Sequence, residues 1–83
     1  MHRSLILAAL LFATPALANQ IEVGAAMGKT EDDVKTALVA LGYDVRKIEV
    51  EDGKIEAYVV KDNGKGEIYV DPTTGLVSKV HMK

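Results

Sequence analysis

The chain has 83 residues, of which 27% are charged and none is cysteine, and its formal net charge at pH 7 is −2. This length allows one domain, and the lack of cysteine excludes disulfides, thiol catalysis and a lipid-attachment cysteine. Acidic and basic residues are interspersed, without a basic stripe or a cationic amphipathic stretch. The composition therefore argues against a nucleic-acid partner and against a membrane-surface helix.

The N-terminus has the order of a secretory signal peptide: a basic start at Arg3, an uncharged apolar stretch over residues 5–13, and an A-x-A site that ends at Ala18. The apolar stretch is shorter than the about 20 residues that span a bilayer. A buried N-terminal helix or a retained anchor is the other interpretation. We expect residues 1–18 to be cleaved, leaving residues 19–83 as one periplasmic or secreted domain without a stable membrane anchor. Losing Arg3 changes the net charge from −2 to −3.

An amphipathic helix is expected near the start of the mature chain. The lead-in "NQIEVGAAMG" contains a brief strand around Ile21 and Val23, and a helix follows. Thr30 suits the N-cap, acidic residues fill the first helical turn, and Gly42 favours a left-handed stop. The apolar side chains that recur at helical spacing are Val34, Leu38 and Leu41.

From Tyr43 onward the apolar residues alternate with a period of two, and three turn signals divide this region into four strands. Residues 52–53, Asp-Gly, and residues 63–64, Asn-Gly, are both typical of two-residue hairpin turns. In the Asp-Pro-Thr-Thr-Gly segment at 71–75, the proline fits the start of a type I turn and the glycine closes it. The pattern predicts an antiparallel meander.

Counting back from the first turn predicts the register of the first hairpin. The count sets Ile48 opposite Ala57, which places apolar pairs on one face of the sheet. Two positions further it sets Arg46 opposite the apolar Val59, which conflicts with that face. We therefore predict a β-bulge at Arg46-Lys47, which returns the preceding apolar residues to the core.

The other two turns complete the expected fold. The second turn sets Tyr58 opposite Tyr69 on the outer face, and the third sets Val70 opposite Val77. The fold class is α+β, with one N-terminal helix packed on a four-stranded antiparallel β-meander. The expected core consists of Val34, Ala37, Leu38, Leu41, Val45, Ile48, Val50, Ile55, Ala57, Val59, Ile68, Val70 and Val77.

Catalytic chemistry is scarce in the mature chain. Its single serine and single histidine, Ser78 and His81, lie three residues apart on a strand and should point to opposite faces, so they do not form a nucleophile–base pair. Glu49 and Glu56 should face each other on the outer surface, where a solvated pair is favoured over a general acid and base. We predict no catalytic residues, no metal site and no cofactor, and we expect that the protein is not an enzyme.

The candidate binding surface is a small patch on the outer face of the sheet. It consists of Tyr58 and Tyr69, bordered by Val60 and Lys47, and such amphipathic aromatic patches are enriched at protein interfaces. Two other interpretations stay open: a cross-strand pair that only stabilises the sheet, or a pair covered by the N-terminal segment.

The order and spacing of these motifs resemble a PepSY domain, the module named from peptidase propeptides. The resemblance covers about residues 30–77. It rests on Gly42-Tyr43 after the helix, the Lys47–Val50 strand, Asp52-Gly53 and the ending Tyr69-Val70-Asp71-Pro72-x-x-Gly75. It implies a helix-plus-sheet fold, an envelope or extracellular location and no catalysis. Members occur in propeptides of secreted metallopeptidases, and the family is suspected of restraining peptidases.

Two functional hypotheses follow. The first is an exported, non-enzymatic binding module that modulates or inhibits a peptidase in trans, because no protease domain follows the module. Its partner would be an unidentified envelope protein, a peptidase among the candidates. The alternative is a sensor or carrier of a small ligand or metal ion, using His81 or clustered carboxylates. We expect a monomer or a weak dimer formed through the edge of the strand that begins at Leu76.

Overall fold

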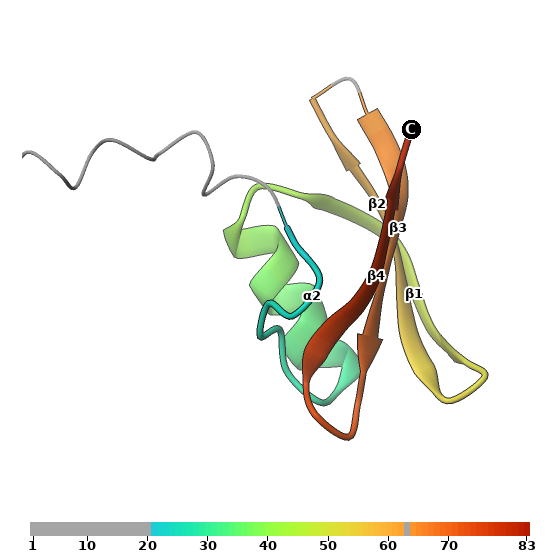
Figure 1. Ribbon diagram of the computed structural model, residues 1–83. Helices are drawn as coiled ribbons and strands as arrows, with labels where there is room; N and C mark the ends of the chain where they lie inside the picture. The colour runs from blue at the N-terminus through green and yellow to red at the C-terminus, as the bar shows by residue number, and fades with distance from the viewer. Residues whose placement is uncertain (1–20, 63) are drawn as a thin grey trace, which may run out of the picture.

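The computed structural model describes residues 21–62 and 64–83 and shows the expected α+β class (Figure 1). One helix precedes four antiparallel strands in the sheet order β1-β2-β3-β4. The helix is central in the sequence rather than N-terminal, since residues 21–30 precede it. The predicted signal peptide, residues 1–18, lies outside the described residues. The elements are α2 (Glu31–Ala40), β1 (Asp44–Glu51), β2 (Lys54–Lys61), β3 (Gly64–Asp71) and β4 (Leu76–Met82).

Local chemistry fixes both ends of α2. Thr30 is the N-cap, and its side chain accepts a 3.1 Å hydrogen bond from the backbone N–H of Asp33. At the other end Gly42 has φ of 93°, which favours glycine, and β2 contributes Lys61, whose Nζ donates a 2.9 Å hydrogen bond to the Leu41 carbonyl. Among the described residues no helix is long and apolar enough to cross a membrane.

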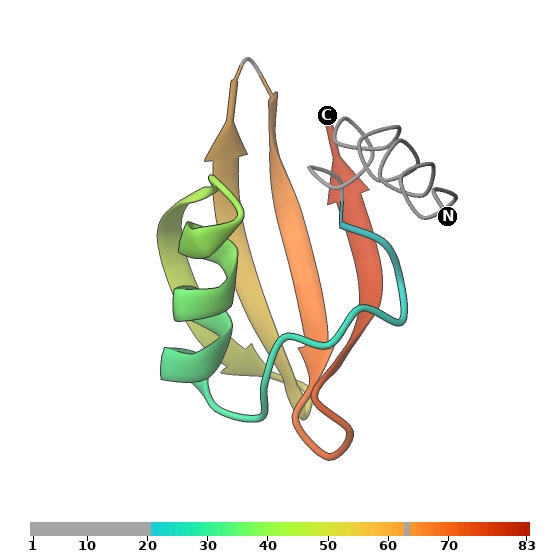
Figure 2. The same cartoon turned by 90° about the vertical axis from the view of Figure 1, so that its left-hand side faces the viewer.

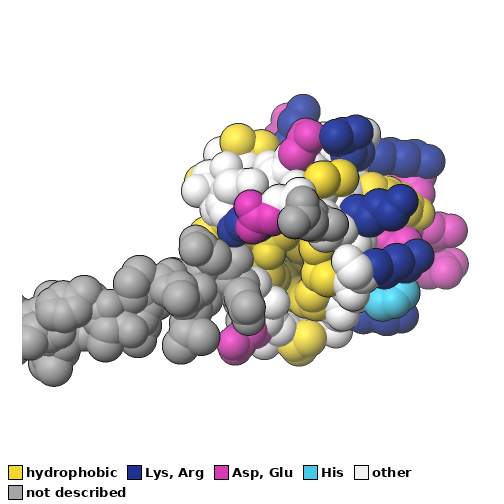
Figure 3. Space-filling view, turned by 90° about the horizontal axis from the view of Figure 1, so that it is seen from above, with side chains coloured by type: hydrophobic (Ala, Val, Ile, Leu, Met, Phe, Trp, Pro, Cys, Tyr) yellow, Lys and Arg dark blue, Asp and Glu magenta, His cyan; other side chains and the backbone are white. Residues whose placement is uncertain are grey.

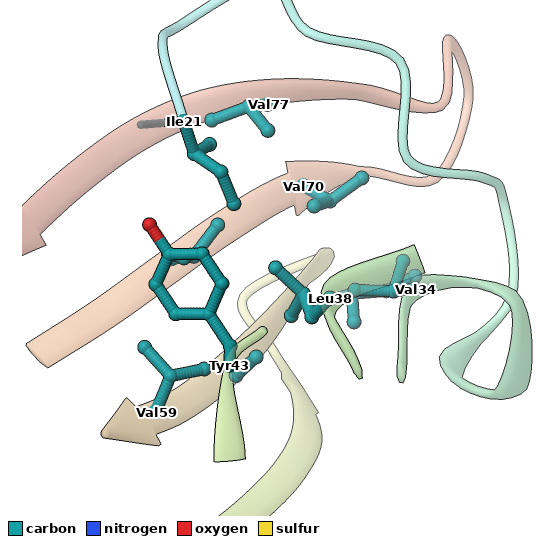
Figure 4. Close-up of a cluster of buried hydrophobic side chains, with 10 residues drawn as sticks. Ile21, Val34, Leu38, Tyr43, Val59, Val70 and Val77 are labelled. Carbon is teal, nitrogen blue, oxygen red and sulfur yellow. The ribbon is translucent and has the colours of Figure 1, made fainter. Parts of the chain in front are cut away.

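The core lies between the sheet and the layer made by α2 and the segment before it. The side chains of Val34 and Leu38 have no exposed surface, and they point from the helix toward the sheet (Figure 4). Figure 2 shows α2 over the β1–β2 half of the sheet, while the preceding segment crosses the β3–β4 half. The buried apolar residues are Ile21, Val34, Leu38, Tyr43, Ile55, Ala57, Val59, Ile68, Val70 and Val77.

The predicted core was wrong at Val50, whose surface is 58% exposed. Val50 faces the inner side of the sheet and pairs with the buried Ile55, as expected. However, it lies on the edge strand close to the turn, and the tip of this hairpin bends away from the helix (Figure 1). The alternation of apolar residues gave the correct face but not how far the helix covers it.

The segment before the helix docks on β4 rather than forming a separate strand at its start. The N–H of Gly24 donates to the Val77 carbonyl at 2.8 Å, and the Val77 N–H donates to the Ala25 carbonyl at 2.9 Å. Ile21 is buried, whereas Val23 is 65% exposed. The chain therefore covers the first part of the outer edge of β4 with its own backbone.

The predicted register is confirmed for the first hairpin and for the last corner. Ile48 pairs with Ala57, and the register shifts between Val45 and Lys47, where the bulge was expected. Val70 pairs with Val77, as predicted from the Asp-Pro-Thr-Thr-Gly corner. A second irregularity, which was not predicted, lies next to this pair: the register shifts between Tyr69 and Val70, because Tyr69 pairs with Lys79.

The predicted register of β2 against β3 was wrong by two residues. Val59 pairs with Gly66 instead of Ile68, because Lys61 pairs with Gly64 and Gly64 therefore belongs to β3 rather than to the turn. Asp62 has φ of 55°, in the left-handed region that type I′ hairpin turns require, so the turn begins one residue earlier than the predicted Asn63. The predicted turn residue Asn63 lies outside the described residues. A shift of two preserves the face of every side chain but changes its partner across the strands.

Candidate functional site

The outer face of the sheet, which is the face away from α2, carries most of the ionisable and aromatic side chains of the strands. Viewed from the β2–β3 end, Lys and Arg side chains gather along this side of the molecule, with acidic side chains and the histidine among them (Figure 3). Two cross-strand rows follow from the pairing: Lys47, Tyr58, Glu67 and His81, then Glu49, Glu56, Tyr69 and Lys79.

The four residues of the predicted patch share this face, but the tyrosines are not a cross-strand pair. Tyr58 lies opposite Glu67, and Tyr69 lies opposite Glu56, so the expected pairing of the two rings was wrong. The tyrosine side chains are half-buried. Lys47 places its Nζ 5.6 Å from the centroid of the Tyr58 ring, within cation–π range.

Tyr69 has an equivalent cation, because the Nζ of Lys79 lies 5.4 Å from its ring centroid. Lys79 comes from β4 and Lys47 from β1, so each tyrosine is covered by a cation from an edge strand. The lysine stems cover part of the aromatic surface while their ammonium groups remain at the solvent boundary. The patch is therefore a mixed aromatic and cationic surface rather than a bare hydrophobic one.

The two tyrosines also belong to a tyrosine–glutamate cluster, formed by Glu51, Glu56, Tyr58 and Tyr69. Glu56 is only 3% exposed, and the Tyr69 hydroxyl donates a 2.9 Å hydrogen bond to its Oε2. Hydrogen bonds to Glu56 raise the pKa of Tyr58 and Tyr69 to about 12 each. Burial acts to raise the pKa of Glu56, but hydrogen bonds from Tyr69, Glu51 and Tyr58 outweigh it and leave that pKa lowered.

Three carboxylates lie close together in and beside this cluster. Oxygen atoms of Glu49, Glu51 and Glu56 lie within 4.8 Å of one another. A hydrogen bond to Glu56, together with the negative charge of Glu56 and Glu49, raises the pKa of Glu51. The expected opposition of Glu49 and Glu56 is confirmed, whereas the part played by Glu51 was missed. Carboxylate oxygens are hard-cation ligands, but here hydrogen bonds within the cluster already engage the buried one.

An open pocket of about 370 Å³ lies at the other end of the outer face, near the β2–β3 hairpin. We call it the outer-face pocket. It adjoins the predicted patch, since Tyr58 and Val60 both line it. Its lining residues are Arg46, Tyr58, Val59, Val60, Lys65, Gly66, Glu67 and Lys83.

Sequence reasoning missed the three cations of this pocket. Lys65 lies beside Val60 only in the observed register, two residues from the predicted one. Arg46 occupies the bulge in β1, whose position was predicted without following its side chain to a neighbour. The bulge was the signal that could have placed Arg46 beside this end of the sheet.

Ser78 and His81 have separate partners and are not brought together. The Ser78 hydroxyl donates to the Tyr69 carbonyl at 3.4 Å, and the His81 Nδ1 lies 3.4 Å from Glu67 Oε1. Both side chains are exposed. These contacts provide neither the nucleophile–base geometry nor the third, orienting group that nucleophilic catalysis needs.

A family model for the peptidase propeptide and YPEB domain, PepSY_2, matches residues 2–81. The chain belongs to this family. The matched region is wider than residues 30–77, which carry the motifs of the PepSY resemblance. It includes β1 to β3 of the PepSY sheet, all of β4 except Met82, and both lysines that cover the tyrosines. No curated protein and no solved structure matches this PepSY chain.

Proposed function

We propose that this PepSY protein is an exported, non-enzymatic binding module that acts in trans on another protein of the cell envelope, and that the partner is a peptidase. The observation that carries the proposal is the match of nearly the whole chain to a family described by peptidase propeptides. Export and cleavage after Ala18 are part of the proposal, and they rest on the order of basic, apolar and small residues at the N-terminus.

The chemistry of the outer face supports binding in preference to catalysis. Half-buried tyrosines covered by lysines offer apolar area, hydrogen-bonding hydroxyls and charge within a small region, as protein interfaces commonly do. In contrast, Ser78 and His81 are exposed and engaged with different partners. Catalysis would need a nucleophile activated by a neighbouring base.

Two measurements on the purified mature protein, residues 19–83, test this function. The protein is immobilised to capture partners from an envelope extract, and it is added to the same extract while peptidase activity is followed with a labelled protein substrate. We expect enrichment of a peptidase and a dose-dependent fall in its activity. Val39→Ala is the control variant and should capture and inhibit the peptidase as the native protein does, because this residue is 53% exposed on the helix, away from the outer face. A peptidase that is neither captured nor slowed would refute the proposal.

The alternative, a sensor or carrier of a metal ion, is favoured by one observation: the close approach of Glu49, Glu51 and Glu56. It is the weaker candidate, because the Tyr69 hydroxyl and the raised pKa of Glu51 account for the close carboxylates without a cation. Calorimetry with calcium, zinc and copper separates the two. Heat that Glu49→Gln abolishes would support a carboxylate site, and heat that His81→Ala abolishes would support the histidine.

A further inference from the structure

We propose that the outer-face pocket binds an acidic, partly apolar peptide segment of the partner protein. A carboxylate of that segment would lie against Arg46 and Lys65, and the adjacent apolar side chain would pack on Tyr58 and Val60. This inference rests on the proposed function and deepens it, because it names the chemistry that the binding module recognises.

The pocket has the size and the lining for one or two side chains. Its volume of about 370 Å³ lies at the lower end of the range of small-ligand sites, about 300–1,000 Å³. Tyr58 and Val60 are half-buried and lie two residues apart on the same face of β2, so they supply a fixed apolar surface held by the sheet. The hydrogen bond of Tyr58 to Glu56 restricts the tyrosine hydroxyl and leaves the ring to make contacts.

The charges around the pocket are complementary to an anion. Arg46, Lys65 and Lys83 line it together with a single acidic side chain, Glu67, whose carboxylate faces His81 at 3.4 Å. Within residues 21–62 and 64–83, no carboxylate forms an ion pair with the side chain of Lys65 or Lys83.

Arg46 is also available to an incoming carboxylate. It pairs with Asp44 at 2.8 Å, but the two side chains are 63% and 60% exposed, and an ion pair in that environment contributes little to stability. A peptide carboxylate can therefore replace Asp44 at low cost and bind the guanidinium through two parallel hydrogen bonds.

An acidic peptide fits this surface better than a polyanion such as a nucleic acid. The chain carries a net charge of −2, so a long polyanion is repelled outside the pocket, whereas a short segment meets the local positive field. Nucleic-acid sites also need a basic stripe that follows the phosphate backbone, and this pocket offers one compact group of cations.

The test measures fluorescence anisotropy of a labelled hexapeptide of alternating glutamate and leucine, titrated with the mature protein. We expect Lys65→Glu to weaken binding about tenfold or more, since the substitution replaces a charge-assisted contact with a repulsive one. Lys35→Glu makes the same change of charge at an exposed position of the helix and should change affinity less than about twofold. Replacing the peptide glutamates with glutamine should weaken binding to the same extent as Lys65→Glu.

Amide chemical-shift mapping locates the peptide independently. We expect shifts at Tyr58, Val60 and Glu67, with little change in α2. Equal losses in Lys65→Glu and Lys35→Glu, shifts centred elsewhere, or equally tight binding of a single-stranded oligonucleotide would each overturn the pocket proposal. If Lys65→Glu loses the peptide but still captures and inhibits the peptidase, the pocket proposal fails and the proposed function stands. If the native protein binds the peptide but inhibits no peptidase, the proposed function fails instead.

Discussion

Replacing Leu38 with alanine tests whether packing of the helix on the sheet provides most of the stability. Leu38 has no exposed surface and lies beside Val34 and Tyr43 where α2 meets the sheet (Figure 4). The substitution removes three buried carbon atoms, worth about 0.8 kcal/mol each, or about 2.4 kcal/mol. The remaining cavity adds about 1 kcal/mol if the surrounding side chains close half of it. We therefore expect Leu38→Ala to lower the free energy of unfolding by about 3–4 kcal/mol.

The assay is urea unfolding followed by circular dichroism. A chain of this length has a total stability of only about 3–10 kcal/mol, so the urea midpoint should fall steeply and can reach the point where part of the population is unfolded without urea. Val39→Ala, the next position on the helix and 53% exposed, should cost less than about 0.5 kcal/mol. A loss below about 1 kcal/mol at Leu38 would refute the packing argument.

Three further perturbations test the outer face, the helix end and the β3–β4 pair. Glu56→Gln should lower the pKa of both cluster tyrosines from about 12 toward the ordinary 10, measured by ultraviolet titration of tyrosinate. Lys61→Met removes the donor to the Leu41 carbonyl and should cost about 1 kcal/mol in urea unfolding. Gly66→Ala should cost about 1–3 kcal/mol and reduce hydrogen-exchange protection at the end of β4, since its Cβ would overlap the His81 carbonyl oxygen.

The tyrosines also determine how stability depends on alkaline pH. Their pKa is higher in the folded protein than the ordinary value of 10, so the folded state holds protons that the unfolded state has released. This contribution is fully present below pH 10 and is lost as the pH rises toward 12. Urea midpoints at the two ends of this window should differ in the native protein and differ less in Glu56→Gln. An equal alkaline loss in both proteins would contradict the role of Glu56.

Most of the fold could be predicted because local signals and apolar alternation agree. Thr30 and Gly42 mark the two ends of the helix. The Asp52-Gly53 turn fixes the register of β1 against β2 closely enough to reveal the bulge. The second turn failed because Asp62, Asn63 and Gly64 offer two overlapping frames for a two-residue loop, and both frames keep the apolar residues on one face.

The candidate site could be predicted only by face. Alternation correctly assigned Tyr58, Tyr69 and Lys47 to the outer surface; the neighbours of both tyrosines along their strands are buried, and Lys47 pairs with Tyr58. Which side chains meet across the strands depends on register, so the contact between Tyr69 and Glu56 and the position of Lys65 beside Val60 could not be derived. The docking of residues 24–26 on β4 depends on contacts distant in sequence, for which a short segment of glycine and alanine gives no signal.

The hydrogen bonds of Val77 with Gly24 and Ala25 join the beginning of the described residues to the final strand. Among the described elements this contact can form only after the other three strands have been synthesised, because Val77 lies in β4, the last of them. Until then Ile21 lacks Val77, which belongs to the same buried cluster. The segment before the helix and the last strand therefore stabilise each other, and loosening either should loosen the other.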